Sequence, residues 1–230
     1  MTSRARIALL LAPVALIAAG AASARAAIIA PSQQLVVLVS AHQARSAPAS
    51  GSTARDLVPA TTPITGARTE LPVIGRSGDW LDVMLAGRPN GRTGWISRSA
   101  TVLTTTQWHI VVDASTRRVT VYRAGRAVKV FAAVVGAPAT PTPRGTFFVE
   151  ESVALSGKQV GGPFALALSA RSDVLQEFAG GPGQIALHGL DNIGGVLGTA
   201  ASHGCVRLAD SSMRWLAARI GPGVPVTVVG

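Results

Sequence analysis

The sequence predicts a mainly β fold with a single clear helix near the C-terminus. Short runs rich in β-branched residues recur along the chain, and each is bounded by Gly, Pro, Asn or Ser. One segment has helical spacing instead, and Asp210 is its expected N-cap. Its apolar positions are Met213, Leu216, Ala217 and Ile220, and Gly221-Pro222 ends it. We therefore expect β-structure closed by one helix.

The first 26 residues have the pattern of a secretory signal peptide. Arg4 and Arg6 precede the apolar stretch 7–19, and Ala24-Arg25-Ala26 is a small-x-small cleavage site. The apolar stretch is shorter than the roughly 20 residues of a membrane-spanning helix. An uncleaved membrane anchor is the alternative. We expect an exported protein of the cell wall, the periplasm or the cell envelope.

The chain is strongly basic, which bears on its partners. It carries 21 Lys and Arg against 11 Asp and Glu, a net charge of +10. An exported basic protein is attracted to anionic surfaces such as cell-wall polymers, although a basic surface without a particular partner is equally compatible. The arginines are scattered and only Lys129 and Lys158 are lysines, so nucleic acid is not an expected partner.

Residues 27–62 form a partly low-complexity segment. The apolar run 34–39 is predicted to be an early strand that belongs with the region after it. Residues 41–62 are rich in Ala, Ser, Thr, Pro and Arg, which predicts a flexible or weakly structured stretch. His42 lies in that stretch and is therefore expected to be solvated.

Residues 63–104 are predicted to form a small β-barrel. Its short runs are 70–75, 79–85 and 92–96, separated by turns such as Arg88-Pro89-Asn90-Gly91. Trp80 and Trp95 are expected to contribute to a small core.

Residues 107–230 are predicted to form a larger, mostly antiparallel β-domain. The expected strands are 108–112, 118–122, 128–135, 145–150, 164–168, 184–187 and 223–229. The intervening stretch 136–144 is so rich in proline that it is expected to be a surface loop. His109 lies in the first strand and is expected to be a half-buried packing residue.

Cys205 is the residue that points most directly to chemistry. It is the only cysteine, so it forms no internal disulfide, and exported structural cysteines normally come in pairs. It lies in the run Ser202-His203-Gly204-Cys205, and His188-Gly189 precedes it at short range. A cysteine thiol with a pKa near 8.5 needs a base or a cation beside it to react as a thiolate. We therefore expect a cysteine nucleophile with a histidine base.

Two histidines compete for the role of base. His188 can accept the thiol proton and later return it to a leaving amine. His203 would lie on the same face as Cys205 if residues 202–205 were extended, so it is either the base or a supporting group. Gly204 allows a tight turn, so the amides of Gly204 and Cys205 can point at a developing oxyanion. Ser202 supplies a further hydrogen bond or holds the loop.

The remaining candidates concern substrate and metal. Arg207 suits a substrate carboxylate through two parallel hydrogen bonds, and a structural ion pair is the alternative. Asp191 is close enough in sequence to be a third member beside His188. No metal site and no cofactor are expected, because neither a second cysteine nor a clear carboxylate ligand accompanies His188, His203 and Cys205.

Two resemblances extend this interpretation. Gly78-Asp79-Trp80-Leu81-Asp82-Val83 and Asn90-Gly91-Arg92-Thr93-Gly94-Trp95-Ile96 resemble a bacterial SH3-like module. Residues 107–230 resemble the L,D-transpeptidase catalytic domain of the YkuD-type fold, a β-sandwich. That resemblance is carried by His188-Gly189, by 202–208 and by the upstream run 140–147. It implies His188 as base, the Gly189 carbonyl as the group that orients its ring, and His203 as a supporting group.

The YkuD resemblance also implies an activity. Cys205 would attack a peptidoglycan stem peptide before its terminal D-alanine, form a thioester and pass it to an amine, giving 3-3 cross-links. Carbapenem-type β-lactams are then expected covalent inhibitors, and the loop 151–163 is expected to fold over the acyl site. The alternatives are a cell-wall cysteine L,D-carboxypeptidase, which passes the acyl group to water, and a non-catalytic wall-binding protein.

Overall fold

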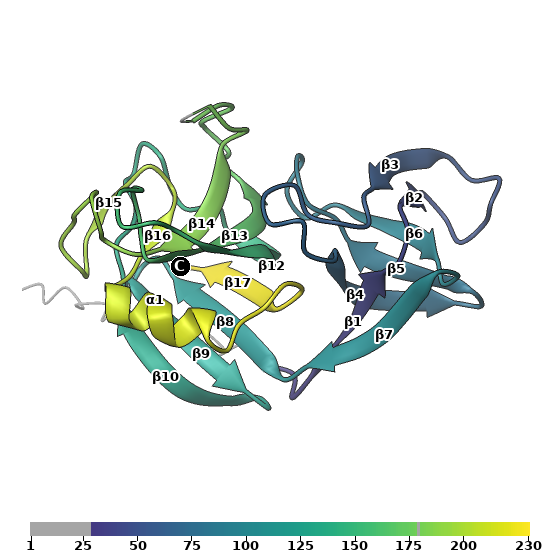
Figure 1. Cartoon of the computed structure of the whole chain (residues 1–230), viewed down its shortest axis with the longest axis horizontal. Helices are drawn as coiled ribbons and strands as arrows, with labels where there is room; N and C mark the ends of the chain where they lie inside the picture. Colours follow the sequence, from purple (N-terminus) through teal and green to yellow (C-terminus); the bar gives the residue numbers. More distant parts are fainter. Residues whose placement is uncertain (1–28, 179) are drawn as a thin grey trace, which may run out of the picture.

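The computed structural model describes residues 29–178 and 180–230, so the predicted signal peptide 1–26 lies outside the described residues. The described chain forms two β-rich lobes that lie side by side (Figure 1). A seven-stranded sheet builds the N-terminal lobe, and an eight-stranded sheet with a two-stranded sheet and one helix builds the C-terminal lobe. The predicted mainly β fold with one helix is confirmed.

The N-terminal sheet has the order β3-β2-β6-β5-β4-β1-β7, with every pair antiparallel. Its strands are β1 (Gln33–Leu38), β2 (His42–Arg45), β3 (Ala54–Val58), β4 (Glu70–Ser77), β5 (Trp80–Met84), β6 (Thr93–Ser97) and β7 (Thr101–Thr106). Alternate residues of these strands are buried, as in β5, where Leu81 and Val83 enter the core. The early strand near 34–39 does belong to this sheet. The likeness to an SH3-like module stays a prediction.

The expectation of a weakly structured stretch at 41–62 is wrong. The stretch contains β2 and β3, which pair with each other and join the sheet through β6. Ala44 and Val58 are buried in the core of this lobe. His42 is buried rather than solvated. Its Nδ1 lies 2.8 Å from the Ser40 carbonyl oxygen and its Nε2 lies 2.8 Å from the Ser99 carbonyl oxygen, so the protein replaces water as the partner of the ring.

The C-terminal sheet has the order β10-β9-β8-β17-β12-β13-β14-β16. Its strands are β8 (Trp108–Asp113), β9 (Arg118–Arg123), β10 (Arg126–Ala132), β12 (Gly145–Ala154), β13 (Phe164–Arg171), β14 (Gln184–His188), β16 (Val206–Arg207) and β17 (Pro225–Val229). The β8–β17 and β14–β16 pairs are parallel, and the other pairs are antiparallel. The small parallel sheet joins β11 (Val135–Gly136) to β15 (Ala200–Ser202).

The helix α1 (Asp210–Ala217) packs Met213 and Leu216 into the core and contacts β13 and β14. The sequence predicted Asp210 as the N-cap of this helix, and that prediction is wrong. Ala209 takes that position without a side-chain hydrogen bond to the helix. The Asp210 carboxylate instead accepts a hydrogen bond from the Leu190 amide at 2.7 Å, so it holds the segment after His188.

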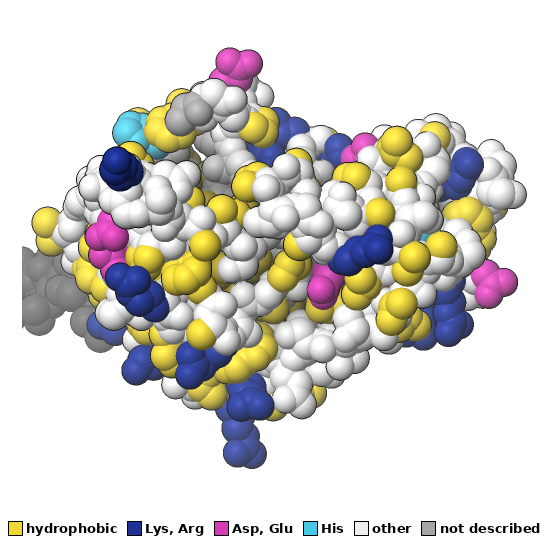
Figure 2. Space-filling model, in the orientation of Figure 1, with side chains coloured by type: hydrophobic (Ala, Val, Ile, Leu, Met, Phe, Trp, Pro, Cys, Tyr) yellow, Lys and Arg dark blue, Asp and Glu magenta, His cyan; other side chains and the backbone are white. Residues whose placement is uncertain are grey.

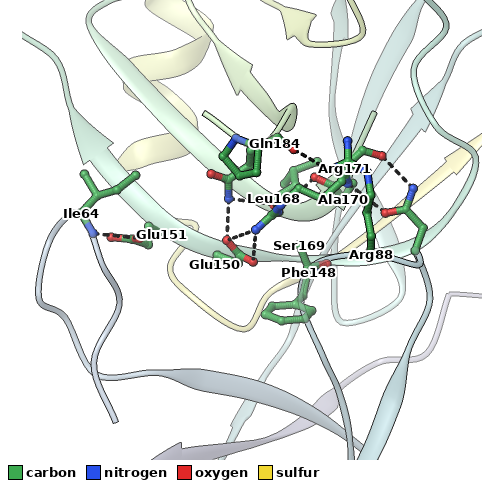
Figure 3. Close-up of polar contacts among 12 residues, drawn as sticks. Ile64, Arg88, Phe148, Glu150, Glu151, Leu168, Ser169, Ala170, Arg171 and Gln184 are labelled. Carbon is green, nitrogen blue, oxygen red and sulfur yellow. Dashed lines mark hydrogen bonds and ion pairs between the residues drawn. The ribbon is translucent and has the colours of Figure 1, made fainter. Parts of the chain in front are cut away.

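The lobes are joined by β12, which is longer than predicted. Phe148 of this strand is buried in the core of the N-terminal lobe. Glu151 accepts a hydrogen bond from the Ile64 amide at 3.2 Å (Figure 3). It also accepts hydrogen bonds from the Thr65 amide and hydroxyl, both at 2.8 Å. Buried apolar and polar contacts therefore both cross the junction.

Two surface properties complete the description. No helix among the described residues is long and apolar enough to cross a membrane. Figure 2 shows Lys and Arg side chains spread over both lobes on this face, instead of gathered in one patch.

Candidate active site

The predicted site residues gather in one cleft of the C-terminal lobe. Cys205, His188, His203 and Arg207 all line it. Gln184, the first residue of β14, and Phe178 line it as well. Residues separated by about twenty positions in sequence therefore face a common space.

The parallel pairing of β14 with β16 brings the two halves of the site together. Leu187 is opposite Val206, and His188 is opposite Arg207. Just before this pairing, Gly204 turns the chain with a φ of +116°, a backbone angle that residues other than glycine rarely adopt. Cys205 consequently lies beside β14.

His188 is buried, and one side of its ring is fixed. Its Nδ1 lies 2.8 Å from the Gly189 carbonyl oxygen, so Nδ1 carries the hydrogen and donates it. Nε2 makes no hydrogen bond to any described residue and is the ring atom left to accept a proton. Asp191 is not the partner of this ring, because its carboxylate interacts with Asp210. Burial lowers the pKa of His188, Arg207 lowers it further, and the Gly189 hydrogen bond opposes them.

Cys205 is half-buried, with its Sγ 4.0 Å from the Gln184 carbonyl oxygen. Burial raises the pKa of this thiol, while a hydrogen bond from the Ala186 amide and the charge of Arg207 lower it. The net direction is upward. Together with the lowered pKa of His188, this shift favours the neutral thiol and the neutral imidazole, and both side chains line one cleft.

The loop before Cys205 is held from within by Ser202. The buried Ser202 hydroxyl donates to the Cys205 carbonyl at 2.5 Å and accepts from the Gly204 amide at 3.1 Å. The expectation that the Gly204 amide points at an oxyanion is therefore wrong, since that amide already has a partner. The Cys205 amide makes no hydrogen bond to the described residues, so it is the donor that remains in this loop.

His203 is exposed, and it does not lie in one continuous strand with Cys205. β15 ends at Ser202 and Gly204 turns the chain, so residues 202–205 are not extended as the same-face interpretation required. The His203 ring stacks on Phe178, with centroids 5.2 Å apart. These two rings form part of the cleft wall.

Arg207 is buried, lines the cleft, and makes no ion pair to any described carboxylate. Its Nη1 donates to the Gly194 carbonyl at 3.3 Å, and its Nε has no hydrogen-bond partner among the described residues. A buried guanidinium that lacks a counter-ion favours an anionic group in the cleft. The structural ion-pair alternative for Arg207 is not observed. No cluster of three His, Cys, Asp or Glu side chains suited to a metal ion occurs in 29–178 or 180–230.

Residues 107–228 match the model of the YkuD family, the L,D-transpeptidase catalytic domain. This match covers more than half of the chain. The chain belongs to the L,D-transpeptidase catalytic-domain family.

Solved L,D-transpeptidases align with this family member at low identity. One from Mycobacterium smegmatis is 20% identical, with 70% of this chain and 82% of that chain covered and a TM-score of 0.42. L,D-transpeptidase 3 from Mycobacterium tuberculosis with a faropenem-derived adduct is 20% identical, with 64% and 79% covered and a TM-score of 0.41. The Enterococcus faecium catalytic domain acylated by ertapenem is 26% identical, with 53% and 95% covered and a TM-score of 0.38. No curated protein sequence matches the chain.

Sequence reasoning missed three groups that hold the site of this L,D-transpeptidase-family chain. Thr142, in the loop expected to be at the surface, is buried and donates to the Gly204 carbonyl at 2.9 Å. Gly161 lies against His188, where an added Cβ would be 2.6 Å from Nδ1. Of the expected loop 151–163, residues up to Ala154 belong to β12, and the later part passes His188. Gly161 carried a sequence signal as a glycine of the loop expected to cover the acyl site, and Thr142 lies in the run 140–147 that carried the YkuD resemblance.

The third group holds Gln184. Its side-chain amide donates to Glu150 and to the Leu168 carbonyl, and Arg171 donates to the same Glu150 carboxylate at 3.2 Å (Figure 3). Because the Gln184 carbonyl faces Cys205, this network fixes the floor on which the thiol rests. No pattern in the sequence indicated it, since its members come from three strands.

Proposed function

We propose that the chain is an exported peptidoglycan L,D-transpeptidase that uses Cys205 as its nucleophile and His188 as its general base and acid. The observation that carries this proposal is the Nδ1–Gly189 hydrogen bond. It leaves Nε2 of His188 as the proton acceptor, in the cleft that also holds the only thiol of the chain. A base held in one tautomer beside a nucleophile is the arrangement that acyl transfer requires.

The acylation step begins from neutral partners. His188 Nε2 takes the Cys205 proton as Sγ attacks the carbonyl carbon that precedes the terminal D-alanine of a stem peptide. The C–N bond then breaks, His188 returns the proton to the leaving amine, and Cys205 is left as a thioester. The Cys205 amide, which has no described partner, is the proposed donor to the oxyanion.

The second step restores the enzyme. The amine of a neighbouring stem attacks the thioester carbonyl, His188 accepts its proton, and the C–S bond breaks to leave the Cys205 thiolate, which regains the proton. The product is a 3-3 cross-link. The segment after β12 passes over one side of His188 at Gly161, which helps keep water from the acyl group.

Recognition follows from the charge in the cleft. Arg207 is a buried cation without a described counter-ion, which suits a carboxylate of the stem peptide or the acid group of a carbapenem. We propose carbapenem-type β-lactams as covalent inhibitors, in line with the acylated relative. The basic surface is proposed to favour anionic wall polymers, and the predicted signal peptide to direct export.

Intact-protein mass after incubation with ertapenem tests the proposal. The wild-type protein without its predicted signal peptide, which starts at Ala27, is compared with its variants Cys205→Ser and His188→Gln. We expect one adduct on the wild type, none on Cys205→Ser, and acylation slowed about 100-fold in His188→Gln because the general base is lost. No adduct on a wild type whose thiol is shown to be reduced would overturn the assignment.

A second measurement separates transfer from hydrolysis. The enzyme is incubated with a tetrapeptide stem and an added amine acceptor, and the products are resolved by mass. A transpeptidase incorporates the acceptor, whereas a carboxypeptidase releases only the tripeptide and D-alanine. Exclusive hydrolysis at saturating acceptor would contradict cross-linking while leaving the Cys205–His188 pair intact.

A further inference from the structure

The turn between β5 and β6 of the N-terminal lobe reaches across to the wall of the cleft. The wall is defined here as residues 172–178 and 180–183, between β13 and β14. Ser172, Leu175, Phe178 and Gly183 of this wall line the cleft together with Cys205. Phe178 also stacks on His203, which lines the same cleft. The placement of the wall therefore decides the shape of the space above the thiol.

Arg88 of that turn ties the two ends of the wall together. Its Nη1 donates to the Pro182 carbonyl at 2.7 Å, and its Nη2 donates to the Ser172 and Leu175 carbonyls at 2.9 and 2.8 Å. A guanidinium presents its donors in a rigid, planar fork, so three acceptors are fixed relative to one another by one side chain. Gly183 permits this approach, since a Cβ there would lie 2.1 Å from the Leu175 carbonyl oxygen and 3.0 Å from Nη2 of Arg88.

Asn90 secures the point where the wall begins. Its Oδ1 accepts from the Arg171 amide at 2.9 Å, and its Nδ2 donates to the Arg171 carbonyl at 2.7 Å and to Asp173 at 3.0 Å. The side-chain amide thus pairs with both backbone groups of Arg171, as a neighbouring strand would. Arg171 itself lies beside Gln184 and Glu150 (Figure 3), so the same point also touches the network under Cys205.

The turn is itself held in place. The Gly87 amide donates to the Ser169 carbonyl at 3.2 Å, and Arg92 donates to the Arg88 carbonyl at 2.9 Å. Arg92 is in turn ion-paired with Asp56 of the same lobe. The turn that carries Arg88 and Asn90 is therefore held by the sheet of the N-terminal lobe. Through these two side chains, that lobe also holds the wall.

We propose that Arg88 and Asn90 are positioning residues through which the N-terminal lobe sets the shape of the cleft for its acyl donor. The inference rests on the proposed function of the cleft and adds a role for the other lobe. Neither residue lines the cleft, so both act through the wall and leave the thiol and its base unchanged. Loss of either anchor impairs the capture of a shaped substrate more than the reactivity of Cys205.

The test compares Arg88→Ala, Arg88→Lys and Asn90→Ala with the wild-type chain. Glu151→Gln is the matched control, because Glu151 also carries hydrogen bonds between the lobes but makes none to the wall. Three readouts are measured on each protein. They are hydrogen exchange of peptides that span 172–183, the second-order rate of acylation by ertapenem, and the rate of Cys205 alkylation by iodoacetamide.

We expect Arg88→Ala and Asn90→Ala to speed exchange of the wall and to slow acylation about tenfold, while alkylation by the small reagent stays unchanged. Arg88→Lys keeps the charge but cannot span three carbonyls, so it should behave like Arg88→Ala. Glu151→Gln lowers overall stability but should keep wall exchange under native conditions, acylation and alkylation at wild-type values, because Glu151 makes no hydrogen bond to the wall. Wall exchange and acylation at wild-type values in Arg88→Ala would overturn the proposal, as would a parallel loss of acylation, alkylation and thermal stability.

Failure of the proposed function gives a different pattern. A wild type that is alkylated at Cys205 but never acylated would refute the transpeptidase assignment. The anchoring itself is then decided by exchange alone, where faster exchange of 172–183 in Arg88→Ala supports it and unchanged exchange refutes it.

Discussion

The hydroxyl of Thr142 donates a hydrogen bond to the carbonyl of Gly204, the residue that precedes Cys205, at 2.9 Å. The same hydroxyl accepts from the Gly136 amide at 2.9 Å, so one buried side chain joins β11, the proline-rich loop and the cysteine loop. Gly136 permits this close packing, because a Cβ there would lie 2.3 Å from the Thr142 amide nitrogen. The proline-rich loop thus supports the loop that carries Cys205.

Thr142→Val is expected to weaken both the fold and the site. Valine has nearly the shape of threonine but leaves the part-buried Gly136 amide and the buried Gly204 carbonyl without their partner, which costs about 1–3 kcal/mol of unfolding free energy. Chemical denaturation measures this loss, and acylation by ertapenem should slow with it. Thr142→Ser keeps the hydroxyl and serves as the control. Equal stability of the valine variant and the wild type would contradict a supporting role for Thr142.

Gly161→Ala is expected to displace His188, the proposed base. Its φ of +83° is strained for alanine, and the new Cβ would lie 2.6 Å from Nδ1 of His188. The ring must then move from the Gly189 carbonyl, so acylation should fall about 100-fold. Gly157→Ala in the same loop is the matched control, since nothing lies within 4 Å of its added Cβ. Similar rates for the two alanine variants would count against the proposed packing of this segment on His188.

The pH dependence of acylation should reflect the lowered pKa of His188. Only the neutral ring accepts the thiol proton, so the rate falls as pH drops through this pKa, with a midpoint below the ordinary histidine value of about 6.5. Arg207→Gln removes one cause of the lowering and should move the midpoint upward. The pH profile of the second-order rate of acylation by ertapenem provides the measurement. A wild-type midpoint above 6.5 would contradict the buried environment described for His188.

Glu151→Gln should destabilise the chain at neutral pH more than in acid. Burial opposes ionisation of this carboxyl, but hydrogen bonds from Thr65 and Ile64 outweigh burial and lower its pKa. The ionised form therefore adds stability above about pH 4.5, and this contribution is lost as pH falls through the lowered pKa. We expect a deficit of about 1–3 kcal/mol at pH 7 that shrinks below pH 4.5, measured by denaturant titration. A deficit that is constant with pH would refute this role.

Much of the fold was predictable because burial leaves a local pattern. The runs at 108–112, 118–122 and 145–150 correspond to β8, β9 and the first part of β12, and the helical spacing of Met213 and Leu216 marks α1. The strands that sequence reasoning missed lack this pattern. β2, β3 and β7 are polar or mixed, and they are held by pairing with neighbours that no local window contains.

By itself, the sequence determined the family, the single thiol at Cys205 and its two histidine candidates, because residue identity and short spacing carry that information. Only the tertiary structure showed how these groups are placed relative to one another. It placed His188 against the Gly189 carbonyl, turned His203 onto Phe178, and tied the Gly204 amide to Ser202. It also set Arg88 and Asn90 against a wall more than eighty residues away. Such contacts depend on strand pairing and lobe packing, which join residues that local sequence cannot relate.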